Sequence, residues 1–496
     1  MLFIGLDVGT AGCKASLVDE RGNVLEYKYC EYSVETPREG YVEMDANLVW
    51  GAVSKALSGI GNKDVAAIGI ATFGEAIIMM DDNDNVLAKS IFYSDIRGTE
   101  EVDDILAAMD RDEVQAITGL PITPMYSANK LLWIKKNQPD LYGKAKKMML
   151  FGDFLAYMLT GERIVDFASA SRTMLLDISQ GTWSDKVSGA LGIDTSLLSK
   201  PVMPGTTAGQ LLPSVASSLG FSQKVKVVAG GHDQIMAALG SGVLKKGESV
   251  DGMGSAECIT LALNREDITP KMYANNYCCE PYVFEDMFVT LAFNISSGTA
   301  IKWYRDAIED VRAEEYAKRG ESLYVQLGKE CSKDISGVHF LPYVAGSGTP
   351  YMDSSTGAAF LGVRSSTRKP DLYRAVLEGV CFEMKVNIET LEQCGIVLDN
   401  TVAVGGGSES DLVMQIKADI WNREIRTVHS AQAGTTGVAI LCSVATGAYA
   451  SIEEAVGQMV RPGKTFVPNA QMVKQYEDKM QTYRRIYGAL KSIQGD

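Results

Sequence analysis

Residues 2–18 read LFIGLDVGTAGCKASLV, an apolar run that glycines interrupt in the middle. The two ends, residues 2–7 and 15–18, carry the apolar and β-branched character of strands. Between them, residues 9–12 supply the small side chains that a tight corner needs. The stretch therefore predicts an antiparallel hairpin at the start of the chain, and the turn at residues 19–23 extends the hairpin into a meander.

A similar stretch recurs at residues 248–261, which read ESVDGMGSAECITL. Strand, glycine corner and strand follow one another there as they do in residues 3–18, which is the mark of a duplicated unit. The alternative is that the two stretches are similar by chance, because glycine-rich turns between strands are common. The duplication predicts two related α/β domains that close on a ligand, at residues 1–246 and 247–450, and residues 451–496 follow as a mainly helical segment that packs on this body.

Strands and helices alternate along the rest of the chain, as expected of α/β domains. Apolar runs and helical periodicity predict strands at residues 65–70, 77–80, 225–229 and 401–404, and helices at residues 131–137, 153–159 and 411–420.

Composition narrows the class of protein. With 496 residues, of which 46% are hydrophobic and 22% charged, the chain is long enough for two or three domains with large cores. The net charge of -15 opposes nucleic-acid binding, because no basic excess can release the counterions of a phosphate backbone. Nine scattered cysteines indicate reduced thiols, and three histidines leave no His/Cys metal cluster.

The same composition predicts a soluble cytoplasmic protein. No apolar run reaches membrane-spanning length, and residues 1–9 lack the pattern of a signal peptide. We expect no partner among nucleic acids or membranes, and base rates for oligomers favour a homodimer.

The two glycine corners are candidate phosphate-binding loops. In the first, Asp7 ends a strand, and Thr10 and Ala11 follow with backbone NH groups that can turn toward one anion. Asp7 could hold magnesium through water, since Mg²⁺ takes one or two carboxylates and keeps several waters. Gly254 and Ser255 offer the same geometry from the second domain. A plain turn is the alternative for each corner.

Asp233 is the candidate general base. It follows the strand at residues 225–229 at the carboxyl end of a sheet, where the ligands of open α/β folds bind. A carboxylate there can accept the proton of a hydroxyl whose oxygen attacks a γ-phosphate. The alternative is a helix N-cap, which is compatible with catalysis, and His232 beside it is interpreted as a packing residue. Gly406 and Gly407 would let adenine or ribose approach the backbone.

Residues 457–465, GQMVRPGKT, look like a Walker A loop, but five residues separate the glycines where that motif has four. No strand is predicted before the segment. We interpret it as a loop between helices, so that nucleotide binding rests on the hairpins.

Two longer patterns resemble the signatures of the FGGY carbohydrate kinase family, which shares its ATPase fold with actin, hexokinase and heat-shock-type chaperones. Residues 125–137, MYSANKLLWIKKN, are similar to the first signature in the spacing of lysine, tryptophan and polar end. Residues 358–363, AAFLGV, together with residues 371–372 and 375–378, are similar to the second. The resemblance covers nearly the whole chain. It implies an α/β fold of two actin/hexokinase-like (ribonuclease-H-like) domains with a cleft between them.

The resemblance also implies an ATP- and Mg²⁺-dependent enzyme and a role for each site residue. Asp7 and Asp233 would lie at the metal, and Asp233 would also act as the catalytic base. The substrate side would be formed by Gly74, Glu75, Asp95, Asp233 and Gln234. The ATP side would be formed by Thr10, Ala11, Gly254, Ser255, Gly298, Lys302, Gly406, Gly407 and Asp411.

The substrate loop departs from familiar members of that family. Xylulose kinases usually carry Gln-Met-His-Gly where this chain has residues 73–76, FGEA, and glycerol kinases carry an arginine where Gly74 stands. A carboxylate at Glu75 would bind hydroxyls and repel a sugar acid. A xylulose-like ketose is the first choice, with glycerol, another polyol, a deoxyketose or gluconate as alternatives. The non-kinase alternative is an actin-like or chaperone-like ATPase switch.

Overall fold

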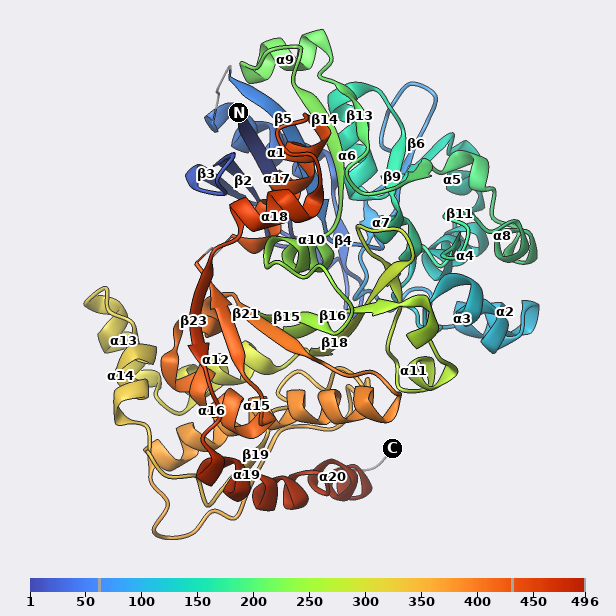
Figure 1. Ribbon diagram of the computed structural model, residues 1–496. Helices are drawn as coiled ribbons and strands as arrows, with labels where there is room; N and C mark the ends of the chain where they lie inside the picture. The colour runs from blue at the N-terminus through green and yellow to red at the C-terminus, as the bar shows by residue number, and fades with distance from the viewer. Residues whose placement is uncertain (61–63, 430–431, 495–496) are drawn as a thin grey trace.

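The computed structural model describes residues 1–60, 64–429 and 432–494, which form two α/β halves, each around one mixed sheet (Figure 1). The first sheet has the order β13-β14-β5-β1-β2-β3, with the bounds Thr207–Gln210, Lys226–His232, Val65–Thr72, Leu2–Val8, Gly12–Asp19 and Val24–Glu31. The second has the order β17-β18-β16-β15-β21-β22-β23, with the bounds Glu280–Pro281, Met287–Asn294, Glu257–Asn264, Glu248–Met253, Asn400–Val404, Ile425–Val428 and Pro462–Phe466.

The two sheets repeat one topology. In each, a hairpin (β1–β2 or β15–β16) is extended by an antiparallel strand (β3 or β18) and continues on its other side into two parallel strands (β5 and β14, or β21 and β22). An antiparallel edge strand, β13 or β23, follows the parallel strands in each sheet, and the second sheet has one further strand, β17, beside β18. The predicted duplication is therefore confirmed, and so are both glycine-cornered hairpins.

Helices surround both sheets (Figure 1). Those of the first half are α1 (Ala46–Ile60), α2 (Glu101–Ala108), α3 (Arg111–Thr118), α4 (Ser127–Asn137), α5 (Pro139–Lys144), α6 (Phe151–Thr160), α7 (Phe167–Ser171), α8 (Asp185–Leu191), α9 (Pro213–Leu219) and α10 (Asp233–Gly240). Those that follow are α11 (Pro270–Ala274), α12 (Ser297–Ala307), α13 (Asp310–Lys318), α14 (Leu323–Glu330), α15 (Lys369–Gln393), α16 (Asp411–Trp421), α17 (Ala433–Ala445), α18 (Ile452–Met459), α19 (Ala470–Tyr483) and α20 (Ile486–Gln494).

Small two-stranded sheets decorate the halves. They pair β4 (Glu43–Met44) with β7 (Ser90–Ile91), β6 (Ile78–Met80) with β8 (Lys147–Met149), β9 (Ile164–Asp166) with β12 (Lys200–Val202), β10 (Leu176–Asp177) with β11 (Thr182–Trp183), and β19 (His339–Leu341) with β20 (Ala359–Leu361). The predicted strands and helices all lie within observed elements or overlap them by all but one residue.

Helix α17 follows strand β22 of the second sheet along the chain, but it packs against β1 and β5 of the first sheet. A Cβ on Gly5 of β1 would lie 2.3 Å from the carbonyl oxygen of Thr435, and one on Gly437 would lie 2.0 Å from that of Met236 in α10. Only glycine permits backbones to approach this closely. A hydrophobic core that includes α10 and α17 therefore joins the two halves. Since α17 falls within the predicted second domain but packs on the first half, the position of the domain boundaries stays a prediction.

The C-terminal segment is helical except for one strand, and this strand corrects the prediction for residues 457–465. Helix α18 ends at Met459, and β23 begins at Pro462 and pairs with β22, so the segment is not a loop between two helices. The Walker-like spacing gives no sign of this strand, because an edge strand of five residues with mixed polarity has little apolar pattern.

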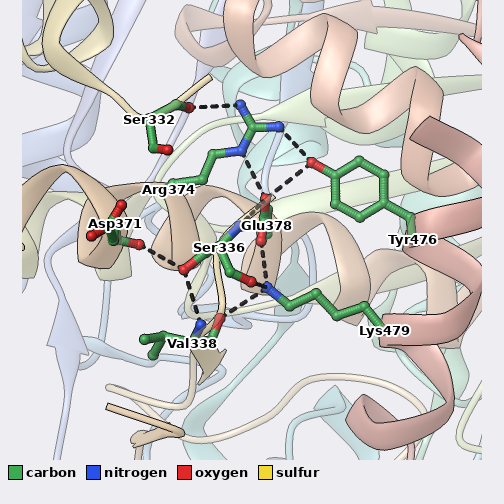
Figure 2. Close-up of polar contacts among 8 residues, drawn as sticks. All are labelled: Ser332, Ser336, Val338, Asp371, Arg374, Glu378, Tyr476 and Lys479. Carbon is green, nitrogen blue, oxygen red and sulfur yellow. Dashed lines mark hydrogen bonds and ion pairs between the residues drawn. The ribbon is translucent and has the colours of Figure 1, made fainter. Parts of the chain in front are cut away.

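A buried ionic clasp ties α19 to α15 (Figure 2). The Glu378 carboxylate accepts from Arg374 Nε at 2.7 Å, from the Tyr476 hydroxyl at 3.0 Å and from Lys479 Nζ at 2.6 Å. Lys479 also donates to the carbonyl oxygen of Ser336 at 2.7 Å. Glu378 ends the second signature, and its contacts show that this signature position joins α19 to α15 of the second half.

Candidate active site

The first glycine corner is a braced turn. The NH of Gly9 donates to the carbonyl oxygen of Gly12 at 3.0 Å, and the hydroxyl of buried Tyr32 donates to the carbonyl oxygen of Gly9 at 2.6 Å. The NH of Tyr32 donates to the carbonyl oxygen of Ala11 at 3.2 Å. Thr10 therefore stands in a loop whose carbonyls are held from the β3 side.

The second corner lies against the start of α12. The NH of Thr299 donates to the carbonyl oxygen of Ser255 at 3.0 Å, and a Cβ on Gly298 would lie 2.2 Å from the carbonyl oxygen of Gly254. A side chain at residue 298 would thus collide with the corner. The structure brings together three of the predicted nucleotide residues, Gly254, Ser255 and Gly298, and Lys302 lies one turn further along the same helix, exposed.

The Gly405–Gly407 turn closes on the same corner. A Cβ on Gly405, whose φ is +87°, would lie 2.6 Å from the carbonyl oxygen of Met253, and one on Gly407 would lie 2.8 Å from the Met253 Cε. Residues 406–409 form a 3-10 turn that leads into α16, where Asp411 is the first residue. The predicted adenosine residues therefore adjoin the predicted phosphate residues.

A cavity of about 230 Å³ opens beside this turn. Its lining includes Gly405, Ser408, Asp411, His429 and Lys464. Lys464 Nζ contacts Asp411 Oδ1 at 2.7 Å. Lys464 belongs to the Walker-like segment, residues 457–465. The sequence does not predict that Lys464 lines this cavity, because the spacing of the glycines only tests for a P-loop. The position of Lys464 depends on the pairing of β23 with β22.

Asp7 and Asp233 lie near one another at one edge of the first sheet. Strands β1, β5 and β14 run parallel, so their carboxyl ends meet, and Asp233 directly follows β14 as the first residue of α10. Burial first, and then the negative charge of Asp233, raise the pKa of Asp7 to about 6, against the opposing charge of Lys14. The Asp233 side chain is 31% exposed, so it is accessible to a ligand.

Two adjacent carboxylates fit a magnesium ion. Mg²⁺ is bound in proteins by one or two carboxylates together with water and substrate phosphates. Within residues 1–60, 64–429 and 432–494, no group of three or more His, Cys, Asp or Glu has a metal-binding arrangement, so a carboxylate-rich protein cage is absent there. Asp7 and Asp233 are the predicted residues that would hold the ion, and this metal site stays a prediction.

A chain of ionisable side chains, buried except at its Asp233 end, leads from Glu75 to Asp233. The Arg172 guanidinium contacts Oε1 of Glu75 and Oε1 of Glu280, and all three side chains are almost completely buried. Oε2 of Glu280 lies 3.2 Å from His232 Nδ1, and His232 Nε2 lies 3.3 Å from Asp233 Oδ1. Glu280 belongs to the second sheet and His232 to the first, so this contact joins the two halves next to Asp233.

Arg172 dominates the electrostatics of this chain. Burial alone would raise the pKa of Glu280, but the positive charge of Arg172, followed by His232, outweighs it and lowers that pKa to about 2. Glu280 is therefore ionised. The sequence predicts neither Arg172 nor Glu280, because neither belongs to a local motif, and it indicates only packing for His232.

The Glu75 loop is built around Arg172. A Cβ on Gly74 would lie 2.6 Å from the Cδ of Arg172, so glycine leaves room for the arginine. Glu75 itself has φ of 73°, and its carbonyl oxygen accepts from the Ser127 hydroxyl at 2.6 Å. The prediction treated the Glu75 carboxylate as open to the substrate, whereas the residue is only 3% exposed and paired. Substrate contact by Gly74 and Glu75 stays a prediction.

Asp95 organises the neighbouring loop. Its two oxygens accept from the Arg97 NH at 2.8 Å, from Arg97 Nε at 2.9 Å and Nη2 at 2.5 Å, and from the Val42 NH at 2.6 Å. Lys130 of the first signature donates to the carbonyl oxygens of Asp95 and Arg97. These bonds use the acceptor capacity of the Asp95 carboxylate, so its surroundings give it a positioning role, and direct sugar contact stays a prediction.

The two predicted sides of the site meet at α10. Burial and then the charge of Asp233 raise the pKa of Tyr93, so Tyr93, two residues before Asp95, lies near Asp233. A Cβ on Gly252 in the second corner's strand would lie 3.7 Å from Oε1 of Gln234. Asp233 and its neighbour Gln234 thus lie near both the predicted substrate loop and the predicted nucleotide-side corner.

Comparisons with known proteins agree with this geometry. Residues 2–240 match the FGGY family of carbohydrate kinases, N-terminal domain, and residues 253–446 match its C-terminal domain. The chain is 26% identical to the xylulose kinase of Bacillus subtilis (strain 168), over 99% of this chain and 97% of that protein. It is also 26% identical to the gluconokinase of Bacillus licheniformis, over 99% and 96% of the two chains.

A solved structure shows the same fold. The ligand-bound xylulose kinase from Lactobacillus acidophilus superimposes with a TM-score of 0.89 at 24% identity, over 99% of this chain and 98% of that one. None of the helices in the described part of the chain combines the length and apolar character needed to span a membrane. The two domain models together match most of the chain, and the similarity to sugar kinases extends over its full length. With the duplicated fold, these matches show that the chain belongs to the FGGY family of carbohydrate kinases.

Proposed function

We propose that this sugar kinase transfers the γ-phosphate of ATP to a hydroxyl of a small neutral ketose, with a xylulose-like ketopentose as the first candidate and Asp233 as the general base. The position of Asp233 carries the proposal: its side chain is accessible, it lies close enough to Asp7 to raise the pKa of that residue, and its neighbour Gln234 lies against the glycine corner of the second half. The enzyme class and the use of ATP follow from the family; the base, the metal and the sugar are the proposed parts.

The proposed proton transfer requires one well-placed carboxylate. As the sugar oxygen attacks the γ-phosphorus, Asp233 accepts the hydroxyl proton, and the loss of that proton makes the oxygen a better nucleophile. A bound Mg²⁺ would neutralise phosphate charge in this reaction. Backbone NH groups of the corners at Thr10 and at Gly254–Ser255 would bind the phosphates from either side.

The charges around the base favour a neutral acceptor. The positive charge of Arg172 is already matched by Glu75 and Glu280, and Asp7 and Asp233 add two further carboxylates. A sugar acid brought into this surrounding would be repelled, whereas hydroxyls can donate to carboxylate oxygens. Because Arg172 contacts Oε1 of Glu75, we expect Oε2 to be the oxygen that meets a sugar hydroxyl.

Gluconate is the second candidate, because a gluconokinase shares 26% identity with the chain, as the Bacillus subtilis xylulose kinase does. An acceptor panel separates the candidates: ADP release is measured with ATP and Mg²⁺ plus xylulose, ribulose, glycerol or gluconate, and with water alone. We expect a ketopentose to give the highest kcat/KM. If gluconate gives the highest value, the charge argument is wrong; if no neutral sugar stimulates ADP release above the water rate, the proposed substrate class is wrong.

A further inference from the structure

A buried ionic cluster lies directly behind the second glycine corner. Asp251 of β15 and Glu257 of β16 flank the corner, and Lys417 of α16 contacts both: its Nζ lies beside Asp251 Oδ2 and donates to Glu257 Oε1 at 2.6 Å. The Ser297 hydroxyl donates to Glu257 Oε2 at 2.6 Å. We call Asp251, Glu257, Ser297 and Lys417 the hub.

The strand register explains why the hub forms. Met253 pairs with Glu257 across the hairpin, and Asp251 lies two residues before Met253, so the side chains of Asp251 and Glu257 emerge on the same face. Helix α16 covers that face and supplies Lys417. The side chains of Asp251, Glu257 and Lys417 are 0% exposed, so nothing in solvent shares this interaction.

The hub joins the three segments that carry the predicted nucleotide residues. The corner with Gly254 and Ser255 connects the two carboxylates along the chain, Ser297 begins the helix of Gly298, and Lys417 sits on the helix that Asp411 begins. These segments also touch through their backbones, as the close approach of Gly298 to Gly254 shows. Lys417, directly and through Glu257, therefore links all three segments.

Stability alone gives little reason for such a cluster. Burial raises the pKa of Asp251 in spite of the adjacent ammonium of Lys417, which shows how strongly the site opposes a bare carboxylate. Apolar side chains of the same volume often stabilise a protein as well as a buried ion cluster does. An ionic cluster differs in being directional, because charged hydrogen bonds fix distances and angles between the elements they join.

We propose that Lys417 is a positioning residue for the nucleotide. Through Asp251 and Glu257, and through Glu257 to Ser297, it holds the corner, α12 and α16 in the arrangement that receives ATP, without touching the nucleotide itself. The inference rests on the proposed function only in taking these segments as the nucleotide side of the site. It adds a determinant of ATP affinity and γ-phosphate alignment that no motif in the chain points to.

The test compares Lys417→Met with Lys479→Met. Both changes remove the ammonium of a largely buried lysine that contacts a fully buried glutamate, but the Lys479 clasp shares no residue with the hub. Lys417→Met should raise the KM for ATP about tenfold or more and lower kcat, with the KM for sugar within about twofold of wild type. Lys479→Met should leave both KM values within about twofold. An unchanged KM for ATP in Lys417→Met, or an equal rise in Lys479→Met, would overturn the proposal.

Ser297→Ala provides a second variant that leaves no charge unpaired, so it should fold even if Lys417→Met does not. It should raise the Kd for ADP about threefold, because one neutral-to-charged hydrogen bond of the hub is lost. Calorimetric titration with ADP and Mg²⁺ in the absence of sugar measures this directly. Because no acceptor is present, a wrong choice of sugar would leave this result untouched. An ADP affinity equal to that of wild type in Ser297→Ala would contradict the hub's positioning role.

Discussion

Replacing Arg172 by methionine takes away the cation that lies between Glu75 and Glu280. Both carboxylates are almost completely buried, so neither can recover its hydration when the guanidinium is lost. Methionine fills a comparable volume, and the variant therefore isolates the loss of charge from the loss of packing.

The magnitude follows from the pKa of Glu280. The pKa is lowered from 4.5 to about 2, and a shift of about 2.5 units corresponds to about 3 kcal/mol of folding free energy, at ~1.36 kcal/mol per unit. A lowered pKa stabilises the folded state above pH 4.5, and this contribution is lost as the pH falls toward 2. Removing one partner of a buried pair costs about 3–5 kcal/mol, which is the same range.

The pH dependence of the variant provides a second signature. Without Arg172, burial dominates and raises the pKa of Glu280, so the folded variant takes up a proton that wild type does not. The variant should therefore lose about 3 kcal/mol at pH 8 and noticeably less at pH 5, measured as apparent free energies of urea unfolding. Arg172→Met/Glu280→Gln should recover part of the loss at pH 8. A loss below about 1 kcal/mol at pH 8, or one that does not change with pH, would refute the assignment of Arg172 as the counter-ion.

Three further changes test other parts of the account. Gly437→Ala should lower the apparent stability to urea by about 1–3 kcal/mol, because its Cβ would lie 2.0 Å from a carbonyl oxygen of α10; a change within about 0.5 kcal/mol would show that the helices separate freely. Lys479→Met should cost about 3 kcal/mol by leaving Glu378 short of a cation, and an unchanged thermal midpoint would contradict the clasp. Gly74→Ala should displace the Arg172 side chain and lower kcat/KM for the sugar by about tenfold or more, with the KM for ATP unchanged. Equal effects on the sugar and on ATP would contradict the proposal that Gly74 belongs to the sugar-binding loop.

The duplicated hairpins and the acid after β14 could be predicted because their evidence is local. Glycines between two apolar runs specify a corner, and Asp233 directly follows a strand that ends in two glycines and a histidine. The similarity between residues 2–18 and residues 248–261 predicts a duplicated domain, and the shared topology of the two sheets confirms this duplication.

The charge networks could not be predicted, because their partners are distant along the chain. Arg172 and Glu280 are 108 residues apart, and Lys417 lies 166 residues from Asp251. Lys417 looks like an ordinary polar position on an amphipathic helix until the fold covers it. Glu75 looks open to substrate in the sequence for the same reason, since only the fold brings Arg172 to it.

The most direct test of the central claim is the product formed by wild type and by Asp233→Asn in the presence of ATP, Mg²⁺ and the preferred sugar. Phosphorus NMR detects the sugar-phosphate ester, and calorimetric titration with ADP checks the nucleotide site of each protein. We expect wild type to form the ester and Asp233→Asn to be slower by about 10²–10⁴-fold with ADP affinity retained, because the amide keeps the size of the carboxylate and cannot take the proton. Ester formation by Asp233→Asn at the wild-type rate would contradict the account.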